Sequence, residues 1–290
     1  MSEALKRNYR VGEEIGRGRF GVVFRCHSVD TGDCVALKSI EKRIIQNDAA
    51  DSRCIPNEAK FMSLVSDHQN VLGIFDVYED DEFLHLVVEY CGSTDLYQRI
   101  TARPDFTELE AHLVMVPLME AISHCHSRGV AHRDIKPDNI LFNSDNVLKL
   151  ADFGSAEYFH SGELMSGIVG TPYYVAPEVL AAREYNEKVD IWSAGIILYI
   201  LITGIPPFYG DSVTEIFESV LRANLRFPKT ILSSPSCEVK DLLRQMLCKD
   251  VFRRFSAEQV LAHPWIIRGK VSRTESCYLA REDVFSSSKY

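Results

Sequence analysis

The sequence predicts an α+β protein built from two lobes, a small β-rich lobe followed by a larger helical lobe. The first 90 residues consist mainly of β-branched and aromatic runs between turn signals such as Asp30–Gly32. After Tyr90, apolar residues recur at helical spacing, most clearly over 109–127. We expect the following division: an N-terminal extension at 1–8, the small lobe at 9–90, the helical lobe at 91–267 and a short flexible tail at 268–290.

In the first lobe, the patterns predict three strands, then a helix, then two strands separated by an acidic turn at 79–82. Phe61, Leu64 and Val65 are expected on one side of that helix. Thr107 and Glu110 have the spacing of a capping box before the first long helix of the second lobe. The expected strands are 7–16, 20–29, 34–41 and two within 75–90; the expected helices are 56–65, 109–127, 192–202, 213–223 and 238–247; the hinge is expected near 89–93.

Composition limits the class of protein. With 290 residues, 46% hydrophobic and 25% charged, the chain can bury a sizeable core, so disorder is expected only at its ends. The formal net charge is −9 and no basic stripe is visible, so a nucleic-acid partner is not expected. An acidic protein favours partners that carry a basic segment.

One apolar stretch, Ile191–Gly210, contains no charged residue. Gly204, Pro206 and Pro207 interrupt it, however, and leave an apolar run of about a dozen residues, the length of a buried helix and too short for a membrane span. The N-terminus also lacks the apolar core of a signal peptide. We therefore expect no membrane association.

The eight cysteines are scattered without a CxxC pair, so neither a zinc site nor a disulfide framework is predicted. Reduced thiols in a cytoplasmic protein are the better interpretation. They are Cys26, Cys34, Cys54, Cys91, Cys125, Cys237, Cys248 and Cys277.

The first chemical motif is a glycine loop, Gly16-x-Gly18-x-x-Gly21. By itself this spacing also fits a dinucleotide-binding turn or a plain tight hairpin. The dinucleotide motif requires a helix directly after the glycines, whereas here an apolar strand follows. A strand–loop–strand with glycines allows backbone amides to approach phosphate oxygens closely.

A lysine, Lys38, ends the apolar strand Val35–Leu37. If it faces the glycine loop, its ammonium can hold the α- and β-phosphates of a nucleotide. Such a lysine needs a carboxylate to hold it in place, and Glu58 in the following helix is the candidate. Taken singly, each residue would more often be an exposed charge.

The string from His132 to Asn139 is the most specific motif. Asp134 is placed to accept or orient the proton of an attacking hydroxyl, and Lys136 can neutralise charge on a transferring phosphoryl group. Asn139, five residues after Asp134, can reach a divalent metal from the same loop.

Two further motifs follow in order. Asp152, in Asp152-Phe153-Gly154, is expected to chelate magnesium that bridges phosphates, while Phe153 packs into the core. The segment 170–178 closes the loop that opens at Asp152. Glu178 is expected to pair with a basic residue such as Arg254, and Asp190 to be a buried support for the catalytic loop.

Together these five ordered motifs resemble the catalytic domain of eukaryotic protein kinases over Tyr9–Ile267. The resemblance implies the bilobal kinase fold, with ATP and Mg²⁺ between the lobes. Lys136 and Thr171 match the serine/threonine pattern. The resemblance also implies a hydrophobic stack of Met62, Ile74, His132 and Phe153, and nucleotide contacts from Ile15, Val23, Ala36, Val88, Asp95, Leu141 and the backbone of Glu89 to Cys91.

Within this family, segments such as 169–180 and 254–259 resemble the calcium/calmodulin-dependent and plant calcium-dependent kinases, and most of all the plant phosphoenolpyruvate carboxylase kinases. That resemblance implies a serine near the N-terminus of phosphoenolpyruvate carboxylase as the target. Asp95 and Asp138 match positions that read basic residues upstream of the target serine, although Ile200 replaces an acid often found beside them.

Two departures from the calcium-dependent group are visible. No EF-hand loop pattern occurs in the chain, and about twenty residues follow the last kinase motif, too few for the usual autoinhibitory and calmodulin-binding tail. Gly167 occupies the position whose phosphorylated side chain often pairs with Arg133, with Ser166 adjacent and Ser161 further upstream.

We expect a monomeric kinase that needs neither calcium nor loop phosphorylation. The alternatives are a related kinase with another protein substrate and a pseudokinase scaffold.

Overall fold

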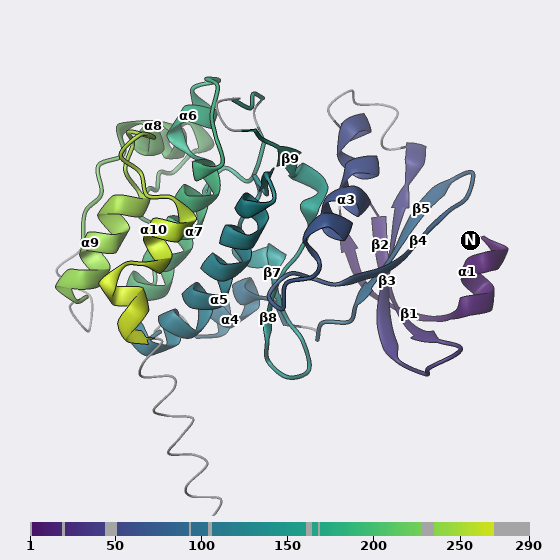
Figure 1. Cartoon of the computed structure of the whole chain (residues 1–290). Helices are drawn as coiled ribbons and strands as arrows, with labels where there is room; N and C mark the ends of the chain where they lie inside the picture. Colours follow the sequence, from purple (N-terminus) through teal and green to yellow (C-terminus); the bar gives the residue numbers. More distant parts are fainter. Residues whose placement is uncertain are drawn as a thin grey trace, which may run out of the picture.

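The computed structural model has the two expected lobes, and the α+β class is confirmed (Figure 1). A β-sheet with one long helix forms the first lobe, and the second is mainly helical. Ser161 and the C-terminal tail beyond residue 269 lie outside the described residues, so expectations about them stay open. The structure describes residues 2–18, 21–43, 51–92, 94–103, 106–160, 164–167, 169–227 and 235–269.

The first lobe contains a five-stranded antiparallel sheet in the order β1-β2-β3-β5-β4. All five expected strands are present, because alternation of apolar residues between turn signals is a local property that survives folding. A register shift in β1 marks an irregularity ahead of the glycine loop. The strands are β1 (Tyr9–Gly18), β2 (Gly21–Ser28), β3 (Cys34–Glu41), β4 (Ile74–Glu79) and β5 (Phe83–Glu89).

The long helix of the first lobe, α3 (Asp51–Val65), begins earlier than the expected residue 56. Its buried face contains Phe61 and Val65, as expected, but the prediction for Leu64 is wrong because this side chain is 38% exposed. Met62, 1% exposed, takes its place. The buried residues follow the i, i+3, i+4, i+7 spacing from Glu58, so the inward face of α3 includes a charged residue.

The N-terminal extension is structured. Residues Glu3–Asn8 form α1, whose Ser2 side chain caps the helix by accepting a hydrogen bond from the Leu5 N–H at 3.3 Å. Leu5 is completely buried and packs in a separate small core on the sheet. Sequence patterning missed this helix because it contains a single large apolar side chain. The other buried members of this core are Cys26, Val35, Leu37 and Val87.

The second lobe contains the four expected helices and several shorter elements. The capping box that was expected at Thr107 and Glu110 is present at the start of α5. The helices are α4 (Leu96–Ala102), α5 (Glu108–Ser127), α6 (Pro177–Leu180), α7 (Lys188–Thr203), α8 (Val213–Arg222), α9 (Cys237–Met246) and α10 (Ala257–Leu261), with 264–269 also helical. The short strands and 3₁₀ turns are β6 (Val130–Ala131), η1 (Pro137–Asn139), β7 (Ile140–Phe142), β8 (Leu148–Leu150), η2 (Phe153–Ser155) and β9 (Glu157–Tyr158).

Helix α7 is the central helix of the second lobe and is buried on all sides, which explains its uninterrupted apolar sequence. It packs against α5 and α9 and ends at Gly204, whose φ of 74° stops the helix. Among the described residues, no helix is both long and apolar enough to cross a membrane. The stretch at 191–210 is therefore a core helix followed by a loop, as its glycine and prolines predicted.

Candidate active site

The glycine loop joins two paired strands. Gly16 pairs with Val23 and Gly18 with Gly21 across β1 and β2, so no helix follows the glycines and a dinucleotide-binding turn is excluded. At Gly21 an added Cβ would lie 1.9 Å from the Ser39 carbonyl oxygen of β3. Only glycine fits this close approach of the strands.

Lys38 lies between two carboxylates. Its Nζ atom is 2.6 Å from Glu58 Oε1 and 3.0 Å from Asp152 Oδ1. The expected pairing with Glu58 is confirmed, and the contact with Asp152 is an addition that sequence spacing did not predict. Because Lys38 belongs to β3, Glu58 to α3 and Asp152 to the second lobe, this triad joins three separate parts of the fold.

The triad has unequal electrostatic environments. Burial opposes the charge of Lys38, but the two adjacent carboxylates outweigh it and raise the pKa of the ammonium. Burial raises the pKa of Glu58 above its usual range despite the attraction of Lys38. Burial also opposes ionisation of Asp152, yet Lys38 outweighs it and lowers the pKa of this carboxyl. Of the two carboxyls, Asp152 is therefore the one whose pKa is shifted in favour of the anionic form.

The loop after β6 gathers four polar side chains. Lys136 Nζ donates to Asp134 Oδ2 at 2.6 Å, and the Thr171 hydroxyl donates to Asp134 Oδ1 at 3.1 Å. Lys136 Nζ also donates to the Thr171 hydroxyl oxygen at 3.1 Å. The Asn139 amide nitrogen donates to the Asp134 backbone oxygen at 2.9 Å. The structure thus brings Asp134, Lys136 and Asn139 together with Thr171 of the activation segment, the stretch from 152 to 178.

Asp190 of α7 supports this loop by binding its backbone. Its carboxylate is 1% exposed and accepts the backbone N–H groups of His132 and Arg133, each at 2.8 Å. His126 Nε2 lies 2.9 Å from the same carboxylate. Asp190 is therefore a buried support for the loop, as expected, while the contribution of His126 was not predicted from the sequence. Burial opposes ionisation of Asp190, but His126, followed by the charge and the backbone N–H of His132, outweighs it and lowers the pKa of this carboxyl.

Of the hydrophobic stack that the resemblance implied, the structure shows the contact between Phe153 and His132. Phe153 is fully buried and its ring meets His132 edge-on, with centroids 4.8 Å apart. Met62 is also buried, and Ile74 packs against the same core. His132 Nε2 lies 3.0 Å from the Ala151 carbonyl oxygen. These contacts place Asp152 beside the catalytic loop.

The expected nucleotide-contacting residues lie on adjacent strands and on the hinge. Ala36 of β3 pairs with Val88 of β5, and Val23 of β2 pairs with Lys38. Leu141 of β7 forms a β-bridge with Asp95. Ile15 lies on β1 and is 41% exposed, whereas Cys91 is buried.

Two hinge side chains have structural partners. Glu89 Oε2 lies 2.6 Å from Lys149 Nζ, and its Oε1 accepts from the Asn143 amide at 3.2 Å, so this carboxylate links the hinge to the β7–β8 hairpin. Asp95 caps α4, because its Oδ1 accepts from the Gln98 N–H at 2.7 Å. Among the described residues, the Cys91 N–H makes no backbone hydrogen bond.

The donor atoms fit a magnesium–nucleotide complex. Asn139 uses its amide nitrogen to bind Asp134, so its carbonyl oxygen can face a cation. Asp152 uses Oδ1 for Lys38, and among the described residues its Oδ2 has no hydrogen-bond partner. One carboxylate and one amide oxygen form the kind of protein ligand set that Mg²⁺ takes when phosphates complete its shell. No group of three or more His, Cys, Asp or Glu that could hold a metal alone occurs in the part of the chain that is described.

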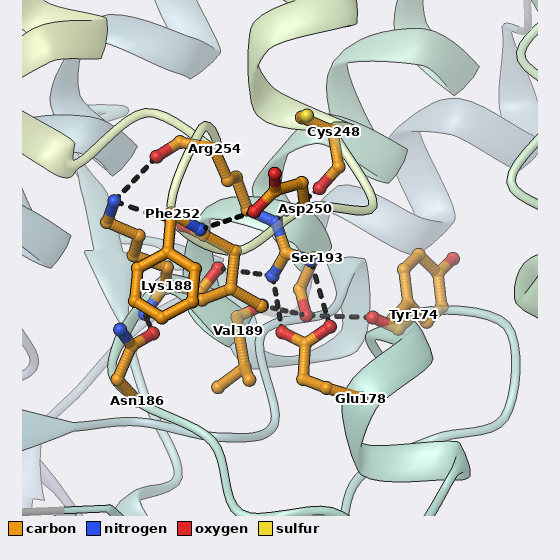
Figure 2. A network of polar contacts seen from close by, with 11 residues as sticks. Tyr174, Glu178, Asn186, Lys188, Val189, Ser193, Cys248, Asp250, Phe252 and Arg254 are labelled. Atoms are coloured by element: carbon orange, nitrogen blue, oxygen red, sulfur yellow. Dashed lines mark hydrogen bonds and ion pairs between the residues drawn. The ribbon is translucent and has the colours of Figure 1, made fainter.

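A second buried ion pair supports the activation segment. Arg254 donates to both oxygens of Glu178, at 2.6 and 2.9 Å, which confirms the expected pairing (Figure 2). Arg254 is completely buried and its guanidinium lies 5.1 Å from the centre of the Trp192 ring. Lys188 adds hydrogen bonds to the backbone oxygens of Val251 and Arg254, at 3.2 and 2.7 Å.

A family model described as "protein kinase domain" matches residues 9 to 266 of this chain. The chain therefore belongs to the protein kinase family, whose members use ATP and a divalent metal. Its fold and the groups around Lys38 and Asp134 agree with that membership.

The curated relatives include calcium-dependent protein kinases of plants. Calcium-dependent protein kinase 14 of Arabidopsis thaliana is 41% identical over 269 residues, which cover 92% of this chain and 50% of that protein. Calcium-dependent protein kinase 20 of Oryza sativa subsp. japonica is 42% identical over 261 residues, which cover 89% of this chain and 47% of that protein. The chain thus spans about half the length of the relatives it matches.

Proposed function

We propose that this chain transfers the γ-phosphate of ATP, as its magnesium complex, to serine or threonine hydroxyls of another protein. The observation that carries the proposal is the meeting of Lys38, Asp152 and the Asp134 loop in one site between the lobes. A pseudokinase would be expected to lack one of these groups, so the active enzyme is favoured.

In this proposal each residue has a defined role. Asn139 and Asp152 hold Mg²⁺, which neutralises phosphate charge when bound. Lys38, positioned by Glu58, binds the α- and β-phosphates, and the backbone of the loop from Gly16 to Gly21 covers them. The adenine base lies between Val23, Ala36 and Leu141, with Ile15 and Val88 beside it and the Glu89–Cys91 backbone at its edge.

Asp134 accepts or orients the proton of the attacking hydroxyl, and Lys136 neutralises charge on the phosphoryl group in transit. Because phosphoryl transfer requires little covalent work, positioning and charge stabilisation supply most of the rate enhancement.

The substrate we propose is phosphoenolpyruvate carboxylase, at a serine near its N-terminus, as the resemblance of the activation segment and of 254–259 implies. Asp138 is exposed beside the catalytic loop, and Asp95 lies at the start of α4, so both carboxylates suit a basic residue a few positions upstream of the target. Asp95→Ala should lower the preference for such peptides. If Asp95→Ala leaves the order of preferred peptides unchanged, Asp95 does not recognise the basic residue upstream of the target.

The proposal includes activity without calcium and without phosphorylation of the activation loop. The 290 residues contain no EF-hand loop pattern, and Gly167 has no side chain to modify.

Each cysteine with a described side chain is a free thiol, which agrees with a cytoplasmic protein. We propose that it acts there as a monomer, which light scattering of the purified chain can check.

The test is a transfer assay with bacterially produced protein that has been treated with phosphatase. It is incubated with ATP, Mg²⁺ and phosphoenolpyruvate carboxylase, in EGTA or in calcium, with a carboxylase whose N-terminal serine is replaced by alanine as the control. Equal phosphorylation of the serine with and without calcium supports the proposal. Transfer to a generic basic peptide but not to the carboxylase would leave a kinase with another substrate, which is the alternative that the calcium-dependent relatives favour.

A further inference from the structure

The guanidinium of Arg133, the residue before Asp134, lies where several segments meet. Its Nε atom donates to the Ser155 carbonyl oxygen at 2.7 Å, and Nη1 donates to the Tyr185 hydroxyl at 3.1 Å. Nη1 also forms an ion pair with Glu157 Oε2 of β9. The Arg133 side chain is only 9% exposed, while that of Glu157 is 46% exposed.

This guanidinium needs a counter-charge, since a buried cation without a partner is strongly destabilising. Of its side-chain partners, Tyr185 is a neutral phenol whose pKa burial raises, despite the opposing effect of Arg133. Among the described side chains, Glu157 is the carboxylate that forms an ion pair with Arg133. Its carboxylate therefore supplies the negative charge at this point.

The backbone of Arg133 is in an unusual conformation. Its φ of 66° lies in the left-handed region, which a residue with a long side chain adopts only when its surroundings hold it there. Asp190 binds the Arg133 N–H from one side, and Glu157 with the Ser155 carbonyl binds the guanidinium at the other end. Because Asp134 follows directly, these contacts set the direction of the peptide that presents the catalytic carboxylate.

The same junction reaches the activation segment. Tyr185 and Met165 exchange two backbone hydrogen bonds, at 2.7 and 2.9 Å, and the Tyr185 hydroxyl donates to the Ser166 carbonyl oxygen at 3.3 Å. At Gly170 an added Cβ would lie 3.0 Å from the Arg133 carbonyl oxygen, so the segment passes directly over this residue. The intervening Gly167, with a φ of 99°, has no side chain that could bring an anion to Arg133.

We propose that Glu157 is a positioning residue for phosphate transfer. Its carboxylate is the chain's own counter-charge for Arg133 and holds the catalytic loop and the activation segment in their active arrangement without a phosphorylated side chain. This inference rests on the proposed transfer activity but not on the identity of the protein substrate. Glu157 acts through Arg133 and touches no reacting atom.

The test is the steady-state kinetics of Glu157→Gln, which removes the charge and keeps the shape. A basic serine peptide serves as substrate, and all proteins are phosphatase-treated. We expect kcat to fall by about tenfold to a hundredfold, because small displacements of a reacting group cost this much, with little change in the KM for ATP. Glu157→Asp keeps the charge and should recover part of kcat. Glu82→Gln is the matched control, since Glu82 pairs with Arg43 at 3.0 Å on the surface.

A double-mutant cycle separates positioning from a general loss of stability. In an Arg133→Met background, Glu157→Gln should have no further effect on kcat, while thermal denaturation shows that each variant is folded. The inference is overturned if Glu157→Gln keeps kcat within about twofold of the unchanged chain, or if it lowers kcat equally in both backgrounds. If the unchanged, phosphatase-treated chain transfers no phosphate to the peptide, the proposed function fails instead, and the two outcomes are distinct.

Discussion

The Lys38 ammonium of β3 and the Glu58 carboxylate of α3 lie 2.6 Å apart, and the Glu58 side chain is 4% exposed. The pair links α3 to the sheet, and its Glu58 carboxylate is too buried for water to replace Lys38 as a partner. Helix α3 also packs against η2, and this contact positions Phe153 and Asp152 beside the catalytic loop.

The first prediction concerns this pair. Glu58→Gln should lower kcat/KM for ATP by at least about tenfold, since Lys38 loses the charge that directs it and keeps only Asp152. Steady-state kinetics with varied ATP measure this loss. Glu79→Gln is the matched control, because Glu79 also lies 2.6 Å from a lysine, Lys42, but is 65% exposed. Equal effects of the two substitutions would contradict the special role of Glu58.

The second prediction concerns Asp134. Asp134→Asn should lower kcat by about 10²- to 10⁴-fold, the range typical of lost general-base assistance, and should leave the melting temperature nearly unchanged. Single-turnover assays on preloaded enzyme isolate the chemical step. Asp33→Asn, in the exposed turn between β2 and β3, is the control and should be fully active. Substantial turnover by Asp134→Asn would show that this carboxylate is not needed for transfer.

The third prediction concerns the buried pair of Glu178 and Arg254. Arg254→Ala should destabilise the fold by about 3–5 kcal/mol, because it leaves the Glu178 carboxylate buried without its partner. Urea denaturation measures the free energy of unfolding. Arg222→Ala breaks an exposed pair with Glu218 on α8 and should cost within about 0.5 kcal/mol. If the two variants lose similar free energies of unfolding, burial of the Arg254–Glu178 pair does not increase its importance for stability.

The fourth prediction is a pH dependence. Hydrogen bonds from the Thr107 backbone and side chain, and then from Arg103, lower the pKa of Glu110 from 4.5 to about 2. Because the folded-state pKa lies below that of the unfolded chain, this carboxylate stabilises the fold fully above about pH 4.5, and the contribution is lost as the pH falls towards 2. The effect should stay below about 1 kcal/mol, since the side chain is 33% exposed.

Glu110→Gln should keep the capping geometry but lose this acid sensitivity. Thermal denaturation between pH 6 and the lowest pH that allows refolding should therefore show a smaller decrease in melting temperature for the variant than for the unchanged chain. Parallel curves would show that Glu110 does not titrate with folding.

Local features of the fold could be predicted from the sequence. The strands before residue 90 and the Thr107 capping box depend on side-chain type and on neighbours a few residues away, so their patterns survive in the structure. The buried face of α3 was only partly predictable, because Leu64 and Met62 are both apolar and the tertiary surroundings of α3 decide which of them is buried. Helix α1 was missed because the burial of Leu5 depends on a small core formed by three distant strands.

The active site, too, was predictable in its local motifs but not in its long-range contacts. Lys38, Asp134, Asn139 and Asp152 could be named from ordered motifs, since the chemistry of phosphate transfer needs those residue types at short spacings. Their partners could not all be named. Lys38 and Asp152 are 114 positions apart, and Arg133 and Glu157 are 24 apart, in both cases without a pattern that links them.

The sequence alone therefore determined which reactive side chains the chain carries and in what order, because these follow from residue type and short-range spacing. Only the tertiary structure decided which charges meet. Burial and Coulomb interactions depend on distances of a few ångströms between residues that the packing of the two lobes brings together. Packing of one lobe against the other brings Asp152 to Lys38, whereas packing within each lobe brings Glu58 to Lys38 and Glu157 to Arg133.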